Sequence, residues 1–311
     1  MILVIYCRLL LALTLLLFAS GVAAQARIQP VQIFQNDSRY QYYQTLLRQA
    51  LEVTQDTHSK TSLQAYASDD AELTDARGLY LLAQKRIDVV FLATSREREE
   101  KFRAIPIPLE KGLLGLRLFL IKESSQPRFD RIENNEQLRE QLMIGFNPQW
   151  ADYDVYEAND FNLLPSSKYS TLFKMLASER FDYFPRGLIE IWSEAERFKM
   201  QYADLQVENR FAFFYDYPIY FFVHKDNELL AKRLELGLKR LQTSGFFDAH
   251  FQAYFGQDIA RAKLEKRQII VLQNPQRPNN TPLIKPSWWP TNTTFPGQAE
   301  NVSDQVSIPH N

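Results

Sequence analysis

The sequence has almost no cysteine. The one cysteine of the 311-residue chain is Cys7, which lies in an N-terminal segment that we expect to be removed during export. The rest of the chain therefore has no disulfide, no thiolate metal site and no cysteine nucleophile. An exported chain of this length without disulfides must rely on an ordinary hydrophobic core, which favours a bacterial periplasmic protein over a small extracellular module.

A surplus of either charge is also lacking, and so are long apolar runs beyond the N-terminus. The chain has 36 Lys and Arg against 37 Asp and Glu. This balance indicates no basic surface for nucleic acid, so we predict no nucleic-acid partner. After residue 26 no apolar run reaches the length that is needed to span a bilayer.

Motifs of common enzyme classes are missing as well. The sequence contains no G-x-S-x-G, H-E-x-x-H, P-loop or G-x-G-x-x-G pattern. Pairs of acidic residues occur, but a chain with 37 acids contains such pairs by chance. The four histidines have no metal-like spacing; they are His58, His224, His250 and His310. We therefore predict neither an enzyme nor a bound metal or cofactor.

The N-terminus has the three parts of a secretory signal. Arg8 supplies a positive charge, residues 9–19 are apolar, and the small residues at 21–26 allow cleavage after Ala24 or Ala26. This pattern predicts a signal peptide over residues 1–26 and a periplasmic location. An uncleaved membrane anchor is the alternative, but the short apolar core argues against it.

Strands and helices alternate along the chain after the signal. The order from residue 31 to residue 93 is strand, helix, strand, helix, strand, and a further set follows residue 116. This alternation predicts an α/β fold with parallel strands joined by right-handed crossovers.

Residues 87–108 concentrate the features of a ligand site. The apolar residues 89–93 follow one another without alternation, as in a strand buried on both faces. The run ends at Thr94 and Ser95, and Ser95 can cap a helix over residues 96–101. Such a loop presents hydroxyls, free N–H groups and Arg98 to the crevice where open α/β sheets bind ligands. The alternating charges of residues 96–101 are also compatible with a solvated helix face.

This stretch resembles the T-x-x-E-R signature of periplasmic solute-binding proteins of the polar amino acid type, known as family 3. The hydroxyls, Glu97 and Arg98 after a buried strand carry the likeness, and the wider pattern extends over residues 31–255. The resemblance implies two lobes, each a mostly parallel sheet flanked by helices, joined by two crossing strands. It also implies that Arg98 grips a ligand carboxylate with the help of Ser95, with Thr94 nearby.

The resemblance also implies the domain boundaries. The first lobe is discontinuous and comprises residues 27–116 and 213–289, including a C-terminal strap at residues 262–289. The second lobe comprises residues 117–212. Residues 290–311 are rich in Pro, Asn and Thr, and we predict a disordered tail there.

The second lobe departs from the family at one position. The resemblance implies an acid about five residues after Asp182 that holds a ligand ammonium, but Gly187 stands there and Arg186 precedes it. The sequence therefore argues against an α-amino acid ligand. Arg186 either faces the cleft or ties down its own loop. If Arg98 and Arg186 both face the cleft, the site suits a dianion.

Three more residues have two interpretations each. Trp150 either covers a ligand as a stacking lid or packs half-buried in its loop. Asp152 either takes a ligand cation or caps a helix. Glu190 is either exposed, which we expect, or a replacement ligand for an amine.

We therefore predict a monomeric periplasmic protein that captures a small, carboxylate-bearing or anionic solute between two lobes and closes around it by rotation. The resemblance implies delivery to an inner-membrane ABC-type permease, as in amino acid transport. Three alternatives stay open: an envelope sensor or accessory protein that passes its closed state to a signalling receptor, a member that has lost ligand binding, and an enzyme built on this scaffold.

Overall fold

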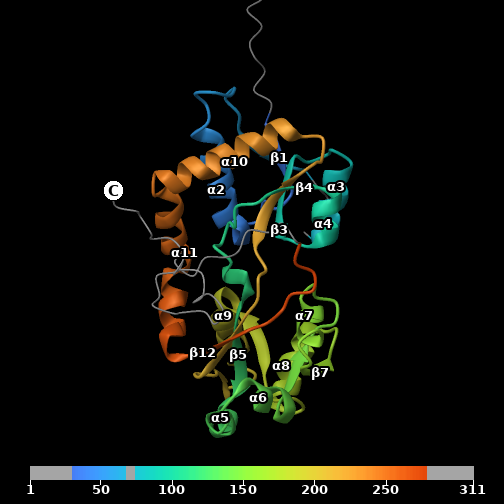
Figure 1. Cartoon of the computed structure of the whole chain (residues 1–311), viewed down its shortest axis with the longest axis vertical. Coiled ribbons are helices and arrows are strands. Elements are labelled where there is room, and N and C mark those ends of the chain that lie inside the picture. Colours follow the sequence, from blue (N-terminus) through green and yellow to red (C-terminus); the bar gives the residue numbers. More distant parts are fainter. Residues whose placement is uncertain (1–29, 68–73, 279–311) are drawn as a thin grey trace, which may run out of the picture.

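The computed structural model describes residues 30–67 and 74–278. The predicted signal peptide, the predicted tail and the end of the predicted strap at residues 279–289 lie outside these ranges. The described residues form two lobes, one above the other in Figure 1. No helix among them is long and apolar enough to cross a membrane.

The first lobe is built on a five-stranded sheet with the order β2-β1-β3-β11-β4. Strands β1, β2 and β3 are parallel, and β11 runs antiparallel to both of its neighbours. Four successive residues of β3 are buried, which confirms the prediction of a strand covered on both faces. The strands are β1 (Val31–Ile33), β2 (Leu63–Ala65), β3 (Val89–Ala93), β4 (Arg103–Ile105) and β11 (Ile219–Val223).

Helices cover this sheet because each has one apolar face. In α2 the buried residues recur at helical spacing, from Tyr42 to Leu51. They allow α2 to pack against α10, where Gly237 lies directly against the backbone of Ala50. The elements of this lobe are η1 (Ser38–Tyr40), α2 (Gln41–Glu52), α3 (Asp75–Ala83), α4 (Arg96–Lys101) and α10 (Glu228–Thr243).

The second lobe is built on a sheet with the order β12-β10-β5-β8, and β9 pairs with β5 as well. A parallel pair, β6 and β7, joins it through a bridge between Ile144 and Tyr183. The strands are β5 (Leu116–Lys122), β6 (Met143–Phe146), β7 (Asn162–Pro165), β8 (Phe184–Gly187), β9 (Leu205–Val207), β10 (Phe211–Phe214) and β12 (Gln268–Val271).

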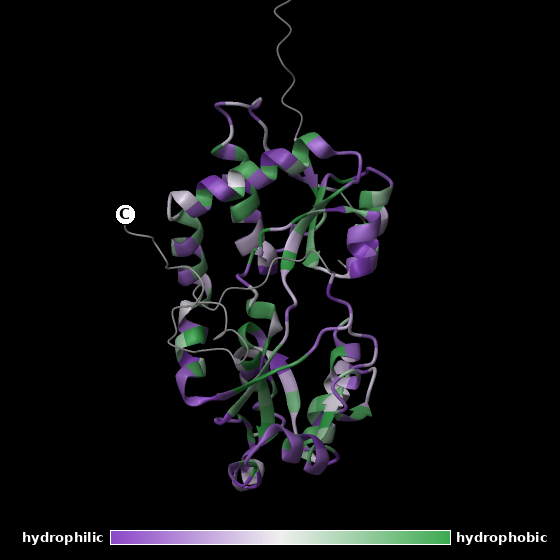
Figure 2. Ribbon diagram, viewed as in Figure 1, coloured by the Kyte–Doolittle hydropathy of each residue, from purple (hydrophilic) through white to green (hydrophobic). Residues whose placement is uncertain are grey.

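Short helices surround this second sheet. They are η3 (Glu123–Ser125), α5 (Gln126–Asp130), α6 (Asn135–Gln141), α7 (Tyr153–Glu157), α8 (Tyr169–Ala177) and α9 (Leu188–Phe198). The strands of both lobes are largely hydrophobic, whereas α4 and α5 at the surface are hydrophilic (Figure 2). The core of each lobe therefore lies on its sheet.

Two segments of chain cross between the lobes. One leads from β4 through η2 (Leu113–Gly115) into β5, and the other leads from β10 to β11. They touch at Gly115, where an added Cβ would lie 1.9 Å from the carbonyl oxygen of Tyr215. The predicted two-lobed α/β architecture with two crossing segments is confirmed. The second sheet is not mostly parallel as expected, because β5 runs antiparallel to β10, β8 and β9.

The predicted position of the C-terminal strap has to be corrected. We expected residues 262–289 to lie on the first lobe, but β12 pairs in parallel with β10 in the second sheet. The reason is the length of α11 (Phe246–Ala262), a helix of 17 residues in which Ile259 and Ala262 are still buried. This helix and η4 (Leu264–Lys266) bring the chain down to the second lobe (Figure 1). Strand β10 also belongs to the second sheet, so the expected boundary at residue 213 falls inside a strand.

Candidate ligand-binding site

A cavity of about 810 Å³ lies between the two lobes. Its volume is in the range of small-molecule sites. The first lobe contributes Tyr40, Tyr43, Asp75, Phe91 and Arg98, and the second contributes Asn147, Trp150, Asp152, Arg186 and Glu190. The cavity therefore has one wall from each lobe, at the end of β3 where the sequence predicted a site.

Arg98 lines the cavity from the first lobe. Its Nη1 donates a hydrogen bond of 2.6 Å to the carbonyl oxygen of Ala93, and its Nη2 donates one of 3.0 Å to Asp75 at the start of α3. The Arg98 side chain is 16% exposed, whereas that of Asp75 is 59% exposed. The guanidinium is therefore held at the end of β3 by a carboxylate that solvent can reach.

Thr94 and Ser95 are not among the residues that line the cavity. The Thr94 hydroxyl donates to Glu99 at 2.5 Å, and the Ser95 hydroxyl accepts from the backbone N–H of Arg98 at 3.3 Å. Ser95 is thus the predicted helix cap. The N–H of Arg96 donates to the carbonyl oxygen of Gln276. These two hydroxyls and the Arg96 N–H are therefore bound to other groups of the protein. This corrects the expectation that Thr94 and Ser95 present their hydroxyls to the cavity.

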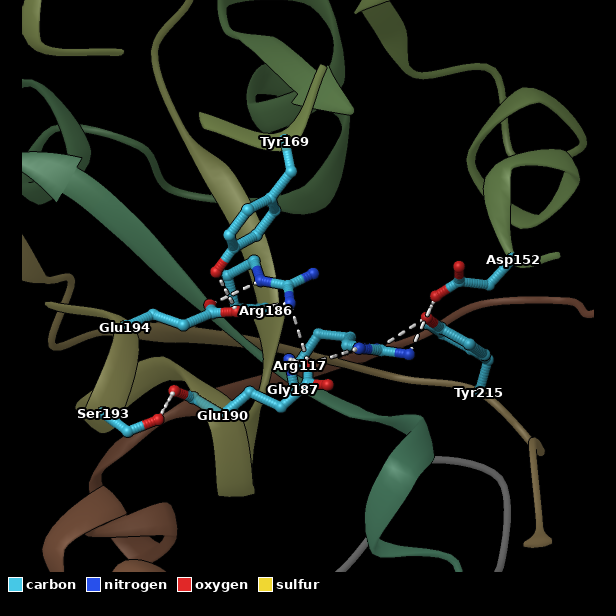
Figure 3. A network of polar contacts seen from close by, with 9 residues as sticks. All are labelled: Arg117, Asp152, Tyr169, Arg186, Gly187, Glu190, Ser193, Glu194 and Tyr215. Carbon is cyan, nitrogen blue, oxygen red and sulfur yellow. Dashed lines mark hydrogen bonds and ion pairs between the residues drawn. The ribbon is translucent and has the colours of Figure 1, made fainter. Parts of the chain in front are cut away.

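Arg186 lies on β8. It both faces the cavity and binds a group of its own lobe, so each of the two predicted interpretations applies in part. It lines the cavity, yet its Nε and Nη2 each donate a hydrogen bond of 2.6 Å to Glu194 (Figure 3). Tyr169 donates to the same carboxylate at 2.7 Å. Arg186 is 6% exposed, so its main partner is a buried carboxylate of its own lobe.

Trp150 also lines the cavity and packs at the same time. Its ring stacks on Phe184 at an interplanar angle of 10°, and the Arg186 guanidinium lies 4.6 Å from the ring centroid. Such a contact between a cation and an aromatic face is favourable. Trp150 therefore forms part of the cavity wall and packs against Phe184 and Arg186.

Asp152 lines the cavity but is bound to a residue that we did not predict. It accepts hydrogen bonds from Arg117 at 2.8 Å and from the Tyr215 hydroxyl at 2.6 Å (Figure 3). Its side chain makes no capping bond to α7. Arg117 also donates to Tyr215 at 2.7 Å. The signal for Arg117 was a single charged residue in an otherwise apolar strand, at residues 116–121.

Glu190, on the first turn of α9, is the charged side chain of the second lobe that is most accessible from the cavity. Its side chain is 39% exposed, and it lies 3.1 Å from Arg186 and 3.7 Å from Arg117. Burial favours the neutral form, but these two guanidiniums outweigh burial and lower the pKa of Glu190. The carboxylate is therefore charged near neutral pH.

Glu190 also occupies the space beside Gly187. Its Oε2 accepts from the Gly187 N–H at 3.3 Å. A Cβ added to Gly187 would lie 2.9 Å from this Oε2 and 3.2 Å from Arg117. A carboxylate therefore stands next to position 187, although the residue at that position has no side chain.

No group of His, Cys, Asp and Glu in the described ranges has the arrangement of a metal site. The side-chain groups around the cavity include guanidiniums, carboxylates, amides and aromatic rings. Such a set recognises an organic solute by hydrogen bonds and stacking.

Comparison with known proteins finds a likeness of structure. No family model matches the sequence, and no curated protein matches it. A probable amino-acid ABC transporter extracellular-binding protein, ytmK from Bacillus subtilis, is 15% identical, with a TM-score of 0.52 over 75% of this chain and all of that one.

Two further solved structures have lower TM-scores. An ancestral arginine-binding protein bound to arginine is 17% identical, with a TM-score of 0.47 over 69% of this chain and 88% of that one. A histidine kinase sensor domain with similarity to periplasmic binding proteins is 15% identical, with a TM-score of 0.48 over 69% and 86%. From its sheets, its two crossings and its match to ytmK, this chain has the two-lobed α/β fold of the periplasmic binding proteins.

Proposed function

We propose that this protein is a divergent periplasmic solute-binding protein of the polar amino acid type, which captures a small solute between its lobes for an ABC-type transporter. The observation that carries the proposal is the cavity with Arg98 on one wall and Glu190 on the other. Its activity is recognition, and rotation of the lobes would bury the solute.

Arg98 is the anchor for an acidic group of the solute. Its present partner, Asp75, is largely exposed, so a ligand carboxylate can replace it at little cost in desolvation. A guanidinium binds a carboxylate through two parallel hydrogen bonds. This geometry supports a carboxylate-bearing solute with its acid toward the first lobe.

The second lobe favours a cationic group instead of a second acid. Two guanidiniums, Arg117 and Arg186, face three carboxylates, Asp152, Glu190 and Glu194. The two guanidiniums are buried, and Glu190 is the most exposed of the five side chains. A dianion would therefore meet a net negative wall, whereas an ammonium or guanidinium group would find Glu190.

This arrangement revises the argument from Gly187. The absence of an acid at this position argued against an amino acid, but the Glu190 carboxylate fills the adjacent space. We therefore infer a zwitterionic solute, with its carboxylate on Arg98 and its cation on Glu190. Aromatic side chains of both lobes cover its apolar part; they are Tyr40, Tyr43, Phe91, Trp150 and Tyr217.

A second candidate is a family member that has lost ligand binding. It has one observation in its favour, since each of Arg98, Arg117 and Arg186 is already paired with a carboxylate of the protein. A screen of solutes separates the two candidates.

The test is a thermal-shift screen with amino acids, dicarboxylates, diamines and small peptides, repeated on Arg98→Ala and Glu190→Gln. We expect a zwitterion to raise the melting temperature and a dicarboxylate without a cationic group to have no effect. Loss of a buried charge partner costs at least about 2 kcal/mol, so each variant should bind the hit about 30-fold more weakly or worse.

The exposed residues Arg103 and Glu140 supply matched controls. Arg103→Ala and Glu140→Gln should bind like the wild type. A hit that keeps its affinity in Arg98→Ala would remove Arg98 from the site, and a preference for dicarboxylates would remove Glu190 as a cation partner. A screen without any hit would favour the member that has lost binding.

A further inference from the structure

One more segment of chain joins the two lobes, besides the two adjacent crossing segments and α11. After β12 the chain leaves the second sheet, passes α7 and reaches the first lobe close to α4 (Figure 1). We call residues 272–277 the clasp. They are separate from the cavity, because none of them lines it.

The clasp begins on the second lobe. The N–H of Leu272 donates to the carbonyl oxygen of Phe214 at 2.8 Å, which extends the pairing of β12 with β10. Gln273 and Asn159 then exchange two hydrogen bonds, of 2.8 and 3.0 Å, at the end of α7. This end of the clasp therefore moves with the second lobe.

The clasp is also bound to one of the two crossing segments, through Asn274 and Arg277. The side-chain amide of Asn274 donates to the carbonyl oxygen of Asp216 at 2.9 Å. The guanidinium of Arg277 forms an ion pair with the carboxylate of the same Asp216. The Asp216 side chain is 13% exposed, so this pair is shielded from solvent and holds the clasp against the hinge.

The end of the clasp is bound to the first lobe. Arg96, the first residue of α4, donates its N–H to the carbonyl oxygen of Gln276 at 3.1 Å and its Nη2 to that of Pro275 at 3.2 Å. The side-chain amide of Gln276 donates to Asp154 of α7 at 3.0 Å. Gln276 alone therefore links α4 of the first lobe to α7 of the second.

We propose that the clasp sets the opening between the lobes and must release before they can rotate. A rotation about the two crossing segments changes the separation of α4 and α7. Gln276 cannot keep its bonds to both helices when that separation changes. Only the bonds of Pro275 and Gln276 to Arg96 and Asp154 have to break, and their side-chain contacts are exposed. Solute binding can therefore drive the release, which shifts the population toward the released state.

The same contact gives a local readout of the clasp. The first N–H groups of a helix have no partner within the helix, and the carbonyl oxygen of Gln276 accepts a hydrogen bond from the N–H of Arg96. Release of the clasp would leave this N–H to water, so its hydrogen exchange reports the state of the clasp.

The experiment measures the distance between the lobes without any ligand. Nitroxide labels are placed at Lys60→Cys on the first lobe and Glu140→Cys on the second, both exposed positions, in a chain that carries Cys7→Ser. Pulsed electron–electron resonance then compares the wild type with Gln276→Ala and with Gln276→Ala/Arg277→Ala. Lys232→Ala, which removes an exposed ion pair of α10, is the matched control.

We expect one narrow distance distribution in the wild type and in the control. Gln276→Ala should broaden the distribution, and the double variant should add a second population. Hydrogen exchange of the Arg96 amide should become faster in both variants. If the double variant does not fold, the single variant alone tests the proposal. Distributions that superimpose on the wild type, together with unchanged exchange at Arg96, would overturn the proposal. Because no ligand is used, this result does not depend on the proposed function.

Discussion

Glu110 is a buried acid at the point where the chain leaves the first lobe. It is 1% exposed and precedes the crossing segment that leads to β5. Its Oε1 accepts a hydrogen bond from the hydroxyl of Tyr43, a cavity residue. Its Oε2 has no hydrogen-bond partner in the described part of the chain. Burial raises the pKa of Glu110 to about 7, although the bond from Tyr43 lowers it.

This raised pKa predicts a dependence of stability on pH. The folded state holds the proton up to a pH of about 7, whereas an unfolded glutamate releases it near its ordinary pKa. The contribution of Glu110 to the free energy of unfolding is therefore highest below pH 4.5, and it is lost as the pH rises through 7. The expected loss is roughly 3 kcal/mol.

Glu110→Gln removes this titration. In urea denaturation from pH 4.5 to 8, the variant should gain stability relative to the wild type as the pH rises, by roughly 3 kcal/mol in all. The exposed Glu140→Gln serves as the control, for which the difference should not change. If the unfolding free energies of Glu110→Gln and the wild type differ by the same amount at every pH, the prediction is contradicted.

The cavity residues differ in how far their roles could be predicted from the sequence. Arg98 and the Ser95 cap follow from a buried strand that ends in two hydroxyls, because this is a local pattern. Arg117 and Glu190 could not be assigned in the same way. Arg117 pairs with Asp152 over 35 positions and with Tyr215 over 98, and such partners come together only in the folded chain.

The contact between α2 and α10 joins two helices that are about 190 residues apart in the chain. Gly237 allows it, because an added Cβ would lie 2.2 Å from the carbonyl oxygen of Ala50. The backbone of α2 cannot move away without disturbing the core beneath it. Glycine is therefore needed here for close approach rather than for a special conformation.

Gly237→Ala should destabilise the protein by about 1–3 kcal/mol, even though alanine favours a helix by about 1 kcal/mol. Gly256→Ala in α11 is the matched control, because the atoms nearest to its Cβ belong to the flexible side chain of Gln252 and not to a backbone. This control should be neutral or more stable by up to about 1 kcal/mol. Urea denaturation measures both, and equal effects of the two substitutions would contradict the explanation.

Elements were predicted best where local pattern and tertiary contact agree. The strand β3 and the helix α4 lie at the expected residues, because an unbroken apolar run and a serine cap before helix-forming residues are both local patterns. The length of helix α11 is decided by tertiary contact instead. Glycine is common at the end of a helix, so Gly256 favours an end near that residue. The helix nevertheless continues to Ala262, because Ile259 and Ala262 are buried.

The relation of the two lobes is decided where the crossing segments touch. Gly115 lies in η2 against the backbone of Tyr215, so closely that any side chain would collide with a carbonyl group. Backbone atoms at this point cannot be moved aside like a side chain. The angle between the lobes therefore depends on the absence of a Cβ at residue 115.

Gly115→Ala should separate the two crossing segments, with a loss of about 1–3 kcal/mol in stability and a shifted distance between the lobes. Gly78→Ala is the control, since its Cβ would lie 3.2 Å from the ring of Phe34 inside the first lobe. The labels at Lys60→Cys and Glu140→Cys report the distance. If both glycine variants give the distribution of the wild type, Gly115 has no role in the interlobe angle.

The sequence by itself determined the α/β class, the expectation of two lobes and the position of Arg98 after the central strand. The α/β class follows from periodicity and the position of Arg98 from a short local motif, which neighbours in the chain are sufficient to specify. The two lobes follow from the family resemblance that this motif carries. Only the tertiary structure decided the partners of the charged groups and the course of the C-terminal segment. A buried guanidinium needs a carboxylate partner, and that of Arg117 is 35 positions away in the chain. The sheet that β12 joins depends on where α11 ends. Both features therefore depend on the packing of the whole chain.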